Sequence, residues 1–375
     1  MINEERRKLQ MEALQALRSN DFRGIVILPT GTGKSYVLIE ALKELYQPGM
    51  SILYTCDSIR LRDIDFDKEL QKWDAQEYSE LMEKECYATA YKYGGKHYNI
   101  LLADEGDYGL TPSYSKLFTE NTFDHIIFVS ATLDKKKRKL AESIVPIVYE
   151  KKIDEIEEKG VINKCDIFYV PYLLNKEEND QYLKFNQRFH HLLQDMNPAN
   201  QKRLEFLTFE RLHFLAGLKS SAYICRELMK DLYSKDANTK MLIFCGSTEQ
   251  ADNVCKYSYH TKSETDWLDI FNKGEIPALA VCGKVDRGIN LEGVNTIIME
   301  FTTASETKMI QKSGRGRRLK VGEVLRLFFL LPYYKQMKTN KMQQYPTIVL
   351  DKIKKACKNI GIENAKTYIL KLENG

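Results

Sequence analysis

A glycine-rich turn between a short apolar run and a helical pattern constrains this chain more than any other feature. The apolar run 25–28 reads as a buried strand, and 36–42 as a helix, with Pro-Thr-Gly-Thr-Gly-Lys-Ser at 29–35 between them. Backbone N–H groups at a helix start, together with the helix dipole, attract anions. Glycine lets such a turn curl around phosphate oxygens without a Cβ clash. The stretch therefore predicts a strand, a phosphate-binding loop and a helix.

Two residues at the end of this turn have specific expected roles. Lys34 would reach the β- and γ-phosphates of a nucleotide, and the Ser35 hydroxyl would hold Mg²⁺. The strict pattern has Gly or Ala where Leu28 stands, so the match is partial. The alternative is a plain strand-to-helix turn. The residues expected around the phosphates are Thr30, Gly31, Thr32, Gly33, Lys34 and Ser35.

Length and composition set broad limits. The 375 residues are enough for about two domains, each with its own core. Hydrophobic residues at 43% and charged residues at 29% describe an ordinary globular protein. A formal net charge of +4 does not by itself indicate nucleic-acid binding, so any basic surface must be local.

Cysteine spacing and hydropathy point to the cytoplasm. The eight cysteines form no Cys-x-x-Cys pair, which is typical of free thiols in a reducing compartment. No apolar run approaches the roughly 20 residues that a membrane span needs, and no signal peptide opens the chain. We therefore expect a cytoplasmic protein without membrane contact.

A second chemical site follows the apolar run 99–103, which reads as a strand buried in a parallel sheet. The strand ends in Asp-Glu-Gly-Asp at 104–107. A carboxylate at a strand end can bind Mg²⁺, and the next one can activate a water. Asp104 is therefore the expected metal ligand and Glu105 the residue that polarises the attacking water. The alternative is an ordinary acidic loop.

Two further segments could support this site. Ser-Ala-Thr at 130–132 follows an apolar strand at 123–129, and its hydroxyls could bond the acidic loop. Arg7 and Gln10 lie on a helical segment upstream of the phosphate loop. An amide side chain can donate and accept together, so Gln10 could read an adenine edge. A solvated helix residue is the alternative.

Nucleic-acid contacts are expected after other strands. Ser58 and Arg60 follow the strand 51–55 and could hold a phosphate backbone, although Asp57 or Ser58 could instead cap a helix. The segment 87–93, which precedes a Gly-Gly turn, could provide a second backbone contact through Thr89 or could equally be a packing strand.

The second half repeats the strand-helix rhythm after a domain boundary near residue 150. Residues 176–237 are mostly helical in period, interrupted by Pro198. The apolar residues expected there in a core, rather than stacked on bases, are Phe189, Phe206, Phe209, Phe214 and Leu215. A Gly-Arg-rich segment at 311–318 could place guanidinium groups on a γ-phosphate, or could be a basic turn.

The order of these elements resembles superfamily 2 helicases. Residues 29–35 look like motif I, 104–107 like motif II of the DExD kind, and 130–132 like motif III. Residues 287–290 resemble motif V, and 311–318 resemble motif VI. The opening and closing motifs look more like the DNA-acting, restriction-type and repair-type branch. The short chain is similar to the minimal forms carried by phages and mobile elements, which would place it in a bacterial host cytosol.

The resemblance implies an α/β protein of two tandem RecA-like domains that hold ATP and Mg²⁺ between them. Each domain would be a mostly parallel sheet flanked by helices, at 1–150 and 151–375, with a helical insertion at about 176–237 in the second. By position, the catalytic residues would be Lys34, Glu105, Arg315 and Arg318. ATP contacts beyond the phosphate loop would be Arg7, Gln10, Gly288 and Asn290. Metal contacts would be Ser35 and Asp104. Nucleic-acid contacts would be Ser58, Arg60, Thr89, Ser247 and Cys282.

The implied activity is an ATP-dependent helicase or translocase. The expected substrate is single-stranded or forked DNA, with RNA not excluded, and the expected partners are replication or recombination proteins. Two alternatives remain open. One is a duplex translocase or annealing motor without strand separation. The other is a nucleic-acid-binding scaffold whose conformation changes when ATP binds, without ATP hydrolysis driving any movement.

Overall fold

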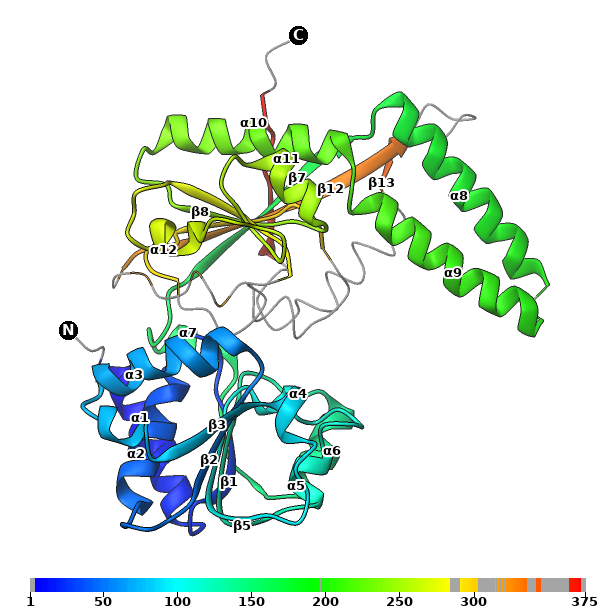
Figure 1. Cartoon of the computed structure of the whole chain (residues 1–375). Helices are drawn as coiled ribbons and strands as arrows, with labels where there is room; N and C mark the ends of the chain where they lie inside the picture. The colour runs from blue at the N-terminus through cyan, green and yellow to red at the C-terminus, as the bar shows by residue number, and fades with distance from the viewer. Residues whose placement is uncertain are drawn as a thin grey trace. The chain divides into compact units, whose positions relative to one another are not determined.

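The chain forms two compact α/β units (Figure 1). The computed structural model describes residues 4–195, 197–283, 291–302, 314, 316, 319, 322–335, 342–344 and 364–371. The first unit runs through Lys164 and also includes Gly314 and Leu319, and the second begins at Cys165. Both are built on a mostly parallel sheet with helices packed against it, which confirms the expected fold class. Across the described residues, no helix combines the length and apolarity that a bilayer span requires.

The first sheet has the strand order β3-β2-β4-β5-β1-β6, and its neighbouring strands pair in parallel. Its strands are β1 Arg23–Ile27, β2 Ile52–Cys56, β3 Met82–Cys86, β4 His97–Ala103, β5 Thr122–Ser130 and β6 Ile147–Glu150. The helices of this unit are α1 Glu4–Arg18, α2 Lys34–Leu45, α3 Phe66–Lys72, α4 Tyr87–Ala90, α5 Lys116–Thr119, α6 Lys135–Glu142 and α7 Ile153–Glu158. The central strands are almost wholly buried, because helices cover both faces of a parallel sheet.

One expected strand in this unit is wrong. The segment expected as a strand at 87–93 begins with the short helix α4, and the strand β3 comes just before it. β3 reads Met-Glu-Lys-Glu-Cys and lies at the edge of the sheet, with its ends buried and its charged centre partly exposed. An edge strand needs no continuous apolar run, so the hydropathy pattern does not reveal it.

The second sheet has the order β14-β7-β12-β11-β8-β10-β9 and is parallel apart from β13, which pairs antiparallel with β12. Its strands are β7 Cys165–Leu173, β8 Met241–Phe244, β9 Ser258–Tyr259, β10 Ala278–Val281, β11 Thr296–Met299, β12 Leu325–Lys335, β13 Met342–Gln344 and β14 Lys366–Thr367. Its helices are α8 Lys176–Gln194, α9 Pro198–Leu215, α10 Lys219–Lys235, α11 Thr248–Val254 and α12 Trp267–Asn272.

The helical stretch 176–237 divides into two parts with different environments. α10 lies on the second sheet and buries Cys225, Leu228 and Leu232 in its core. The antiparallel pair α8 and α9, here called the α8–α9 hairpin, extends away from that sheet (Figure 1). Pro198 occupies the first turn of α9, where its missing N–H breaks no helical hydrogen bond.

The expected core residues of this stretch are only partly confirmed. Leu215 is buried, and Phe189 and Phe214 are half-buried. Phe206 and Phe209, however, are 63% and 68% exposed, so their expected core role is wrong. They lie on a helix that is packed against one partner helix rather than between a sheet and another layer.

A buried carboxyl group sits beside the edge of the second core. Glu300 follows β11, and its Oε1 accepts a hydrogen bond from the Gln250 amide at 2.9 Å. Its Oε2 is buried and, within the described ranges, has no hydrogen-bond partner. Burial raises the pKa of Glu300 from its ordinary 4.5 to about 7, against the opposing effect of hydrogen bonds from Ser221 and Gln250.

Replacing this carboxyl group should change how stability depends on pH. A raised folded-state pKa means that the native state prefers the neutral acid, so stability is complete below pH 4.5 and falls as pH rises through about 7. Glu300→Gln keeps the acceptor but cannot ionise. Its free energy of unfolding relative to wild type should therefore rise by about 3 kcal/mol between pH 4.5 and pH 8. Urea titrations at both pH values measure this, with Glu292→Gln on the exposed loop as the control. An equal offset at both pH values would contradict it.

Candidate functional site

Parallel pairing brings three chemically interesting loops to one edge of the first sheet. Ile27 of β1 lies opposite Ser130 of β5, and Ala103 of β4 lies opposite Phe128 of β5. The loops that follow these strands therefore leave from the same edge, as the carboxyl ends of parallel strands must. The segments 28–33 and 104–107 and the end of β5 converge there.

The phosphate loop has a backbone that requires glycine. Gly31 and Gly33 have φ values of +95° and +91°, a region that side-chain-bearing residues rarely adopt. The Thr32 hydroxyl donates to the Pro29 carbonyl at 2.7 Å and closes the turn. A Cβ on Gly33 would lie 2.2 Å from Nε2 of Gln10, so the missing side chain makes room for that amide.

Gln10 ties helix α1 to this loop. Its Nε2 donates to the Thr32 carbonyl at 2.8 Å, and the side chain is buried. Its Oε1 is also buried but has no partner within the described part of the chain. The donor of this amide is thus used by the loop, and a spare acceptor remains. That acceptor suits an exocyclic amino group such as that of adenine.

A hollow of about 520 Å³ lies next to Gln10's helix and has an aromatic wall. The Arg7 guanidinium lies 4.2 Å from the centre of the Tyr36 ring, and Tyr36 meets Trp73 edge to face with ring centres 4.7 Å apart. Arg7, Tyr36 and Trp73 all line the hollow. Flat groups of this kind can contact a nucleobase.

Lys34 and Glu105 form an ion pair under the phosphate loop. Lys34 Nζ lies 3.7 Å from Glu105 Oε1, and both side chains are about nine-tenths buried. Glu105 has φ +44°, the left-handed region that costs energy in a residue with a side chain. The strain turns the glutamate toward the lysine from the end of β4. The structure therefore brings together two residues that the motifs predicted as catalytic.

Asp104 is buried beside this pair. Its Oδ1 accepts from the Glu105 N–H at 2.8 Å, and the Tyr54 hydroxyl lies 3.4 Å from its Oδ2. Burial, and then the charge of Glu105, raise the pKa of Asp104 to about 7, while Lys34 opposes the shift. A divalent cation against this carboxylate would offset the penalty for its charge. Ser35, the other expected metal contact, is half-buried in the first turn of α2.

Ser130 and Lys137 hold the last acid of the motif. The Ser130 hydroxyl donates to Asp107 Oδ1 at 3.2 Å, which confirms the expected link between 130–132 and the acidic loop. Lys137 Nζ donates to the Asp107 carbonyl at 2.6 Å and lies 3.4 Å from its carboxylate. Sequence analysis missed Lys137, and also Tyr87, whose hydroxyl donates to the Asp104 carbonyl at 3.0 Å. Their position at strand or helix ends on the same edge is the only signal that could have found them.

Gly314 connects the basic segment to the phosphate loop. A Cβ on Gly314 would lie 2.6 Å from Thr30 Cβ, so the two backbones approach closely within the first unit. Thr30 Oγ1 is buried, without a partner among the residues described. The other predicted residues of motifs V and VI lie outside the described residues: Gly288, Asn290, Arg315 and Arg318.

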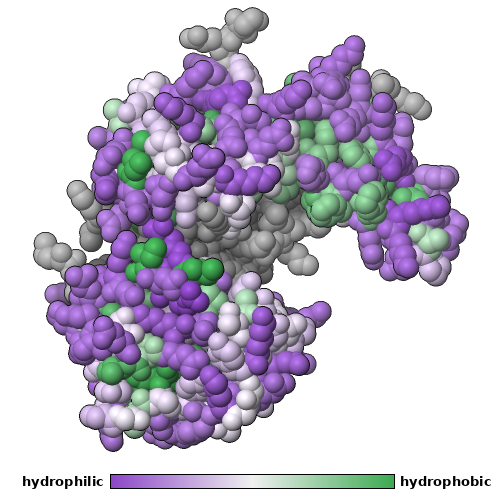
Figure 2. All heavy atoms as spheres, viewed as in Figure 1, coloured by the Kyte–Doolittle hydropathy of each residue, from purple (hydrophilic) through white to green (hydrophobic). Residues whose placement is uncertain are grey.

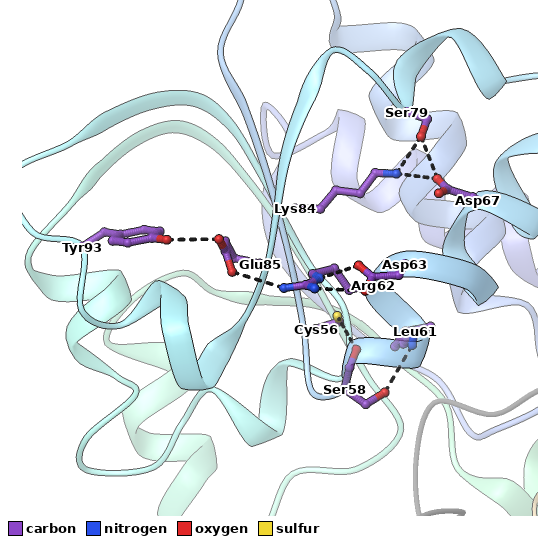
Figure 3. A network of polar contacts seen from close by, with 10 residues as sticks. All are labelled: Cys56, Ser58, Leu61, Arg62, Asp63, Asp67, Ser79, Lys84, Glu85 and Tyr93. Atoms are coloured by element: carbon purple, nitrogen blue, oxygen red, sulfur yellow. Dashed lines mark hydrogen bonds and ion pairs between the residues drawn. The ribbon is translucent and has the colours of Figure 1, made fainter. Parts of the chain in front are cut away.

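The first predicted nucleic-acid segment is engaged in contacts of its own unit. The Ser58 hydroxyl accepts from the Leu61 N–H at 3.4 Å, as in the alternative helix-capping interpretation (Figure 3). Arg62 is held by Asp63 at 2.6 Å and Glu85 at 3.6 Å (Figure 3). These carboxylates fix the arginine while leaving it partly exposed.

The other predicted nucleic-acid contacts are spread over both units. Arg60 lies 3.6 Å from Asp65, and Thr89 is half-buried on α4. In the second unit, Ser247 caps α11 by accepting from the Gln250 N–H at 3.1 Å, and Cys282 is half-buried after β10. Their roles toward nucleic acid stay predictions.

Two family models match separate parts of this chain. Residues 3–142 match the family described as type III restriction enzyme, res subunit, and residues 222–320 match the helicase conserved C-terminal domain. The chain is 23% identical over 360 residues to the DNA 3'-5' translocase XPB2 of Sulfurisphaera tokodaii. That match covers 86% of this chain and 80% of the relative.

Solved structures share the fold at low identity. Dbp5 of S. cerevisiae, bound to RNA and ADP BeF3, has a TM-score of 0.61 at 14% identity, covering 97% of this chain and 90% of its own. The Hef helicase domain of Pyrococcus furiosus has a TM-score of 0.52 at 12% identity, covering 86% and 94%. Both units therefore share the RecA-like α/β fold of these structures.

Removing the Gln10 amide should weaken nucleotide binding. Gln10→Ala deletes the bond to the Thr32 carbonyl and leaves space behind Gly33, so the loop loses its support. We expect about a tenfold increase in the Kd for ATP, equivalent to one lost hydrogen bond of about 1.4 kcal/mol. Fluorescent-nucleotide titration measures it. Gln15→Ala, on the exposed face of the same helix, should bind as wild type does, and equal affinities for all three proteins would contradict the assignment.

Proposed function

We propose that this chain, a DExD/H-type helicase of superfamily 2 with two RecA-like domains, is an ATP-driven motor that moves along DNA. Its strongest support is the buried pair of Lys34 and Glu105, 3.7 Å apart beneath a glycine turn. A lysine that serves only stability gains little from such a place, because burying a charge is costly even when it is paired. Binding of a nucleotide's phosphates by the loop would compensate for this cost, because the lysine would then contact their negative charge.

The residues of the loop fit a nucleoside triphosphate with its magnesium ion. Gln10 and Thr30 each present a buried oxygen that no described residue satisfies, and Gly31 and Gly33 give the turn the positive φ values that a phosphate-binding loop requires. Bound Mg²⁺ would neutralise phosphate charge and orient the terminal phosphate. Ser35 and Asp104 are the residues that would hold it, since hydroxyl and carboxylate oxygens are its preferred ligands.

The residues of the proposed site then have distinct roles in ATP hydrolysis. Lys34 binds the β- and γ-phosphates, and Glu105 orients and accepts a proton from the attacking water. Arg315 and Arg318 stabilise charge on the transferred phosphate, as planar guanidinium groups do. Asp107, held by Ser130 and Lys137, fixes the acidic loop to the end of β5.

DNA is the proposed track. The relative XPB2 is named a DNA 3'-5' translocase, and the family matched by the first domain is named for a restriction enzyme. Backbone contacts through Ser58, Arg60, Thr89, Ser247 and Cys282 would make binding largely independent of sequence and sensitive to salt. Such a motor would serve replication, recombination or repair, together with proteins of those pathways, in the cytoplasm.

A duplex translocase is the second candidate, because the relative's name describes translocation rather than unwinding. Two assays separate the possibilities. An unwinding motor displaces a strand from a forked duplex, whereas a duplex translocase displaces only the third strand of a triplex. ATP hydrolysis measured with single-stranded, duplex and forked DNA and with RNA identifies the preferred substrate. Nucleotide binding without hydrolysis on any of them would favour an ATP-switched scaffold.

Removing the loop lysine should abolish ATP hydrolysis without unfolding the domain. Lys34→Ala deletes the phosphate contact and the ion pair with Glu105, so a modest loss of stability accompanies the loss of activity. DNA-stimulated phosphate release measures hydrolysis, and circular dichroism measures the fold. Lys116→Ala, at an exposed position of helix α5 in the same unit, is the matched control. Hydrolysis by Lys34→Ala at the wild-type rate would refute the proposed function.

Removing the proposed arginine finger should separate binding from turnover. Arg315 adjoins Gly314, which lies against Thr30 of the phosphate loop. Arg315→Ala should bind ATP nearly as wild type does but hydrolyse it about 10³-fold more slowly, because the contact forms chiefly in the transition state. Nucleotide titration measures the affinity for ATP, and single-turnover phosphate release measures the rate of hydrolysis. Arg315→Lys should restore little, since lysine lacks the planar fork. Unchanged turnover in Arg315→Ala would remove this role.

A further inference from the structure

The α8–α9 hairpin carries exposed aromatic side chains that its own packing does not explain. Phe206 and Phe209 of α9 are 63% and 68% exposed, and Leu212 continues the same spacing at 45%. Residues three apart on a helix share a face, so they form one apolar stripe. Figure 2 shows hydrophobic residues gathered over this hairpin among hydrophilic neighbours. Single exposed apolar residues are common on protein surfaces, whereas a contiguous exposed apolar stripe usually marks a contact surface.

Basic side chains border one end of the stripe. A hollow of about 520 Å³ between the two helices is lined by Arg188, His191, Leu192, Lys202, Arg203, Phe206 and Leu207. None of these lining residues is acidic. Arg188 forms an ion pair with Glu210, with Nη2 3.5 Å from Oε2. Lys202 and Arg203 are exposed and form no ion pair with any described residue. The hollow is therefore lined by basic side chains from both helices together with the ring of Phe206.

A second hollow meets the first at Phe206. It measures about 340 Å³, and Phe206 and Phe209 line it together with Phe185 and Phe214, whose ring centres are 5.4 Å apart. Phe206 thus lines both hollows, and the second also includes Glu210, the ion-pair partner of Arg188, and His213. Cationic side chains beside exposed aromatic rings suit a single strand, whose phosphates and bases need both kinds of contact.

The hairpin is fixed at its base and free along its outer part. Asn175 and Glu178 form a reciprocal capping box at the start of α8, and Glu178 also accepts from the Ser220 N–H at 3.1 Å. Tyr182 is buried against Tyr334 of β12, with ring centres 4.9 Å apart. Beyond residue 185, the described part of α8 buries no side chain. The basic and aromatic residues therefore lie on a firmly anchored but accessible arm.

We propose that the α8–α9 hairpin binds single-stranded nucleic acid, with bases on Phe206 and Phe209 and phosphates on Lys202 and Arg203. The inference rests on the proposed motor function and adds a contact outside its motifs. A single strand is the fitting ligand because paired bases hide their faces, whereas unpaired bases can stack on a phenylalanine ring. The charge favours a polyanion over an apolar peptide, since a peptide would leave the cations unpaired.

Two double variants test base stacking and phosphate binding separately. The double variant Phe206→Ala/Phe209→Ala removes the stacking surface, and Lys202→Gln/Arg203→Gln removes two phosphate contacts. Because all four side chains are exposed, both proteins should fold. The matched controls are Tyr233→Ala and Lys230→Gln on the exposed face of α10 in the same unit. Anisotropy of a labelled oligodeoxythymidylate and of a labelled oligouridylate reports affinity for DNA and for RNA.

The expected effects differ between the two variants. The aromatic variant should raise the Kd for the single strand by about tenfold, within the range that one or two base stacks provide. The charge variant should also weaken binding, and its slope of log K against log salt should be less negative by about 1.4, or 0.7 per phosphate. Neither should change binding to blunt duplex DNA or the rate of ATP hydrolysis without nucleic acid. The oligonucleotide, DNA or RNA, whose Kd changes less in these variants is the one that the hairpin binds less strongly.

A fluorescence measurement tests stacking directly. In Phe206→Trp, the added indole emission should be quenched when oligodeoxythymidylate binds, whereas Tyr233→Trp should show no such change. Unaltered affinity in both double variants, with wild-type binding and ATP hydrolysis intact, would overturn the hairpin contact alone and leave the surface to a protein partner. Absence of nucleic-acid-stimulated hydrolysis in the wild-type chain would overturn the proposed motor and this inference together.

Discussion

Parallel pairing of the first sheet is the constraint on which the site depends. β1 lies between β5 and β6, and β4 lies between β2 and β5, with every pair running in the same direction. The loops after β1, β4 and β5 therefore open at a common edge. Lys34 and Glu105 are distant in the sequence, yet this geometry leaves them 3.7 Å apart. Helix α1 then fixes the first loop from the side through Gln10.

The charges at this edge are arranged for ligand binding rather than for stability. Asp104 is buried where ionisation is unfavourable, and Lys34 and Glu105 are paired at a distance too long for a strong hydrogen bond. Asp107, by contrast, is held by hydrogen bonds from Ser130 and Lys137. Groups held in this state gain most when an anion and a cation arrive together, which is the composition of a magnesium nucleotide.

Local motifs predicted that Lys34 and Glu105 belong to one site, and the structure places them 3.7 Å apart. Features that depend on tertiary packing remained hidden. Gly33 and Lys34 could be placed because a glycine turn after an apolar strand has few physical explanations. β3 was missed because an edge strand tolerates charge at its centre. Phe206 and Phe209 were assigned to a core because phenylalanine usually is buried, and nothing in their spacing reveals that α9 faces a single partner helix.

Glu300 illustrates a second limit of sequence reasoning. One glutamate after an apolar strand looks like any surface residue, and only the packing of Gln250 and Ser221 around it makes it a buried acid. Tyr54 and Tyr87 are similar, because their contacts with Asp104 follow from neighbouring strand ends and not from any motif. Such residues become visible only when the sheet order is known.

The anchoring of the α8–α9 hairpin has a mechanical consequence. Asn179 both donates to and accepts from the backbone of Lys335 at the end of β12, so the first turn of α8 is fastened to the second sheet at two points. α8 has 19 residues. At 1.5 Å per residue it is a lever about 28 Å long, and a turn of about 10° at its root sweeps its tip through about 5 Å. Phe206 lies about halfway along this lever, where it shares hollows with Phe185 and Arg188 of α8. The same turn would therefore move it by about half as much, roughly 2–3 Å.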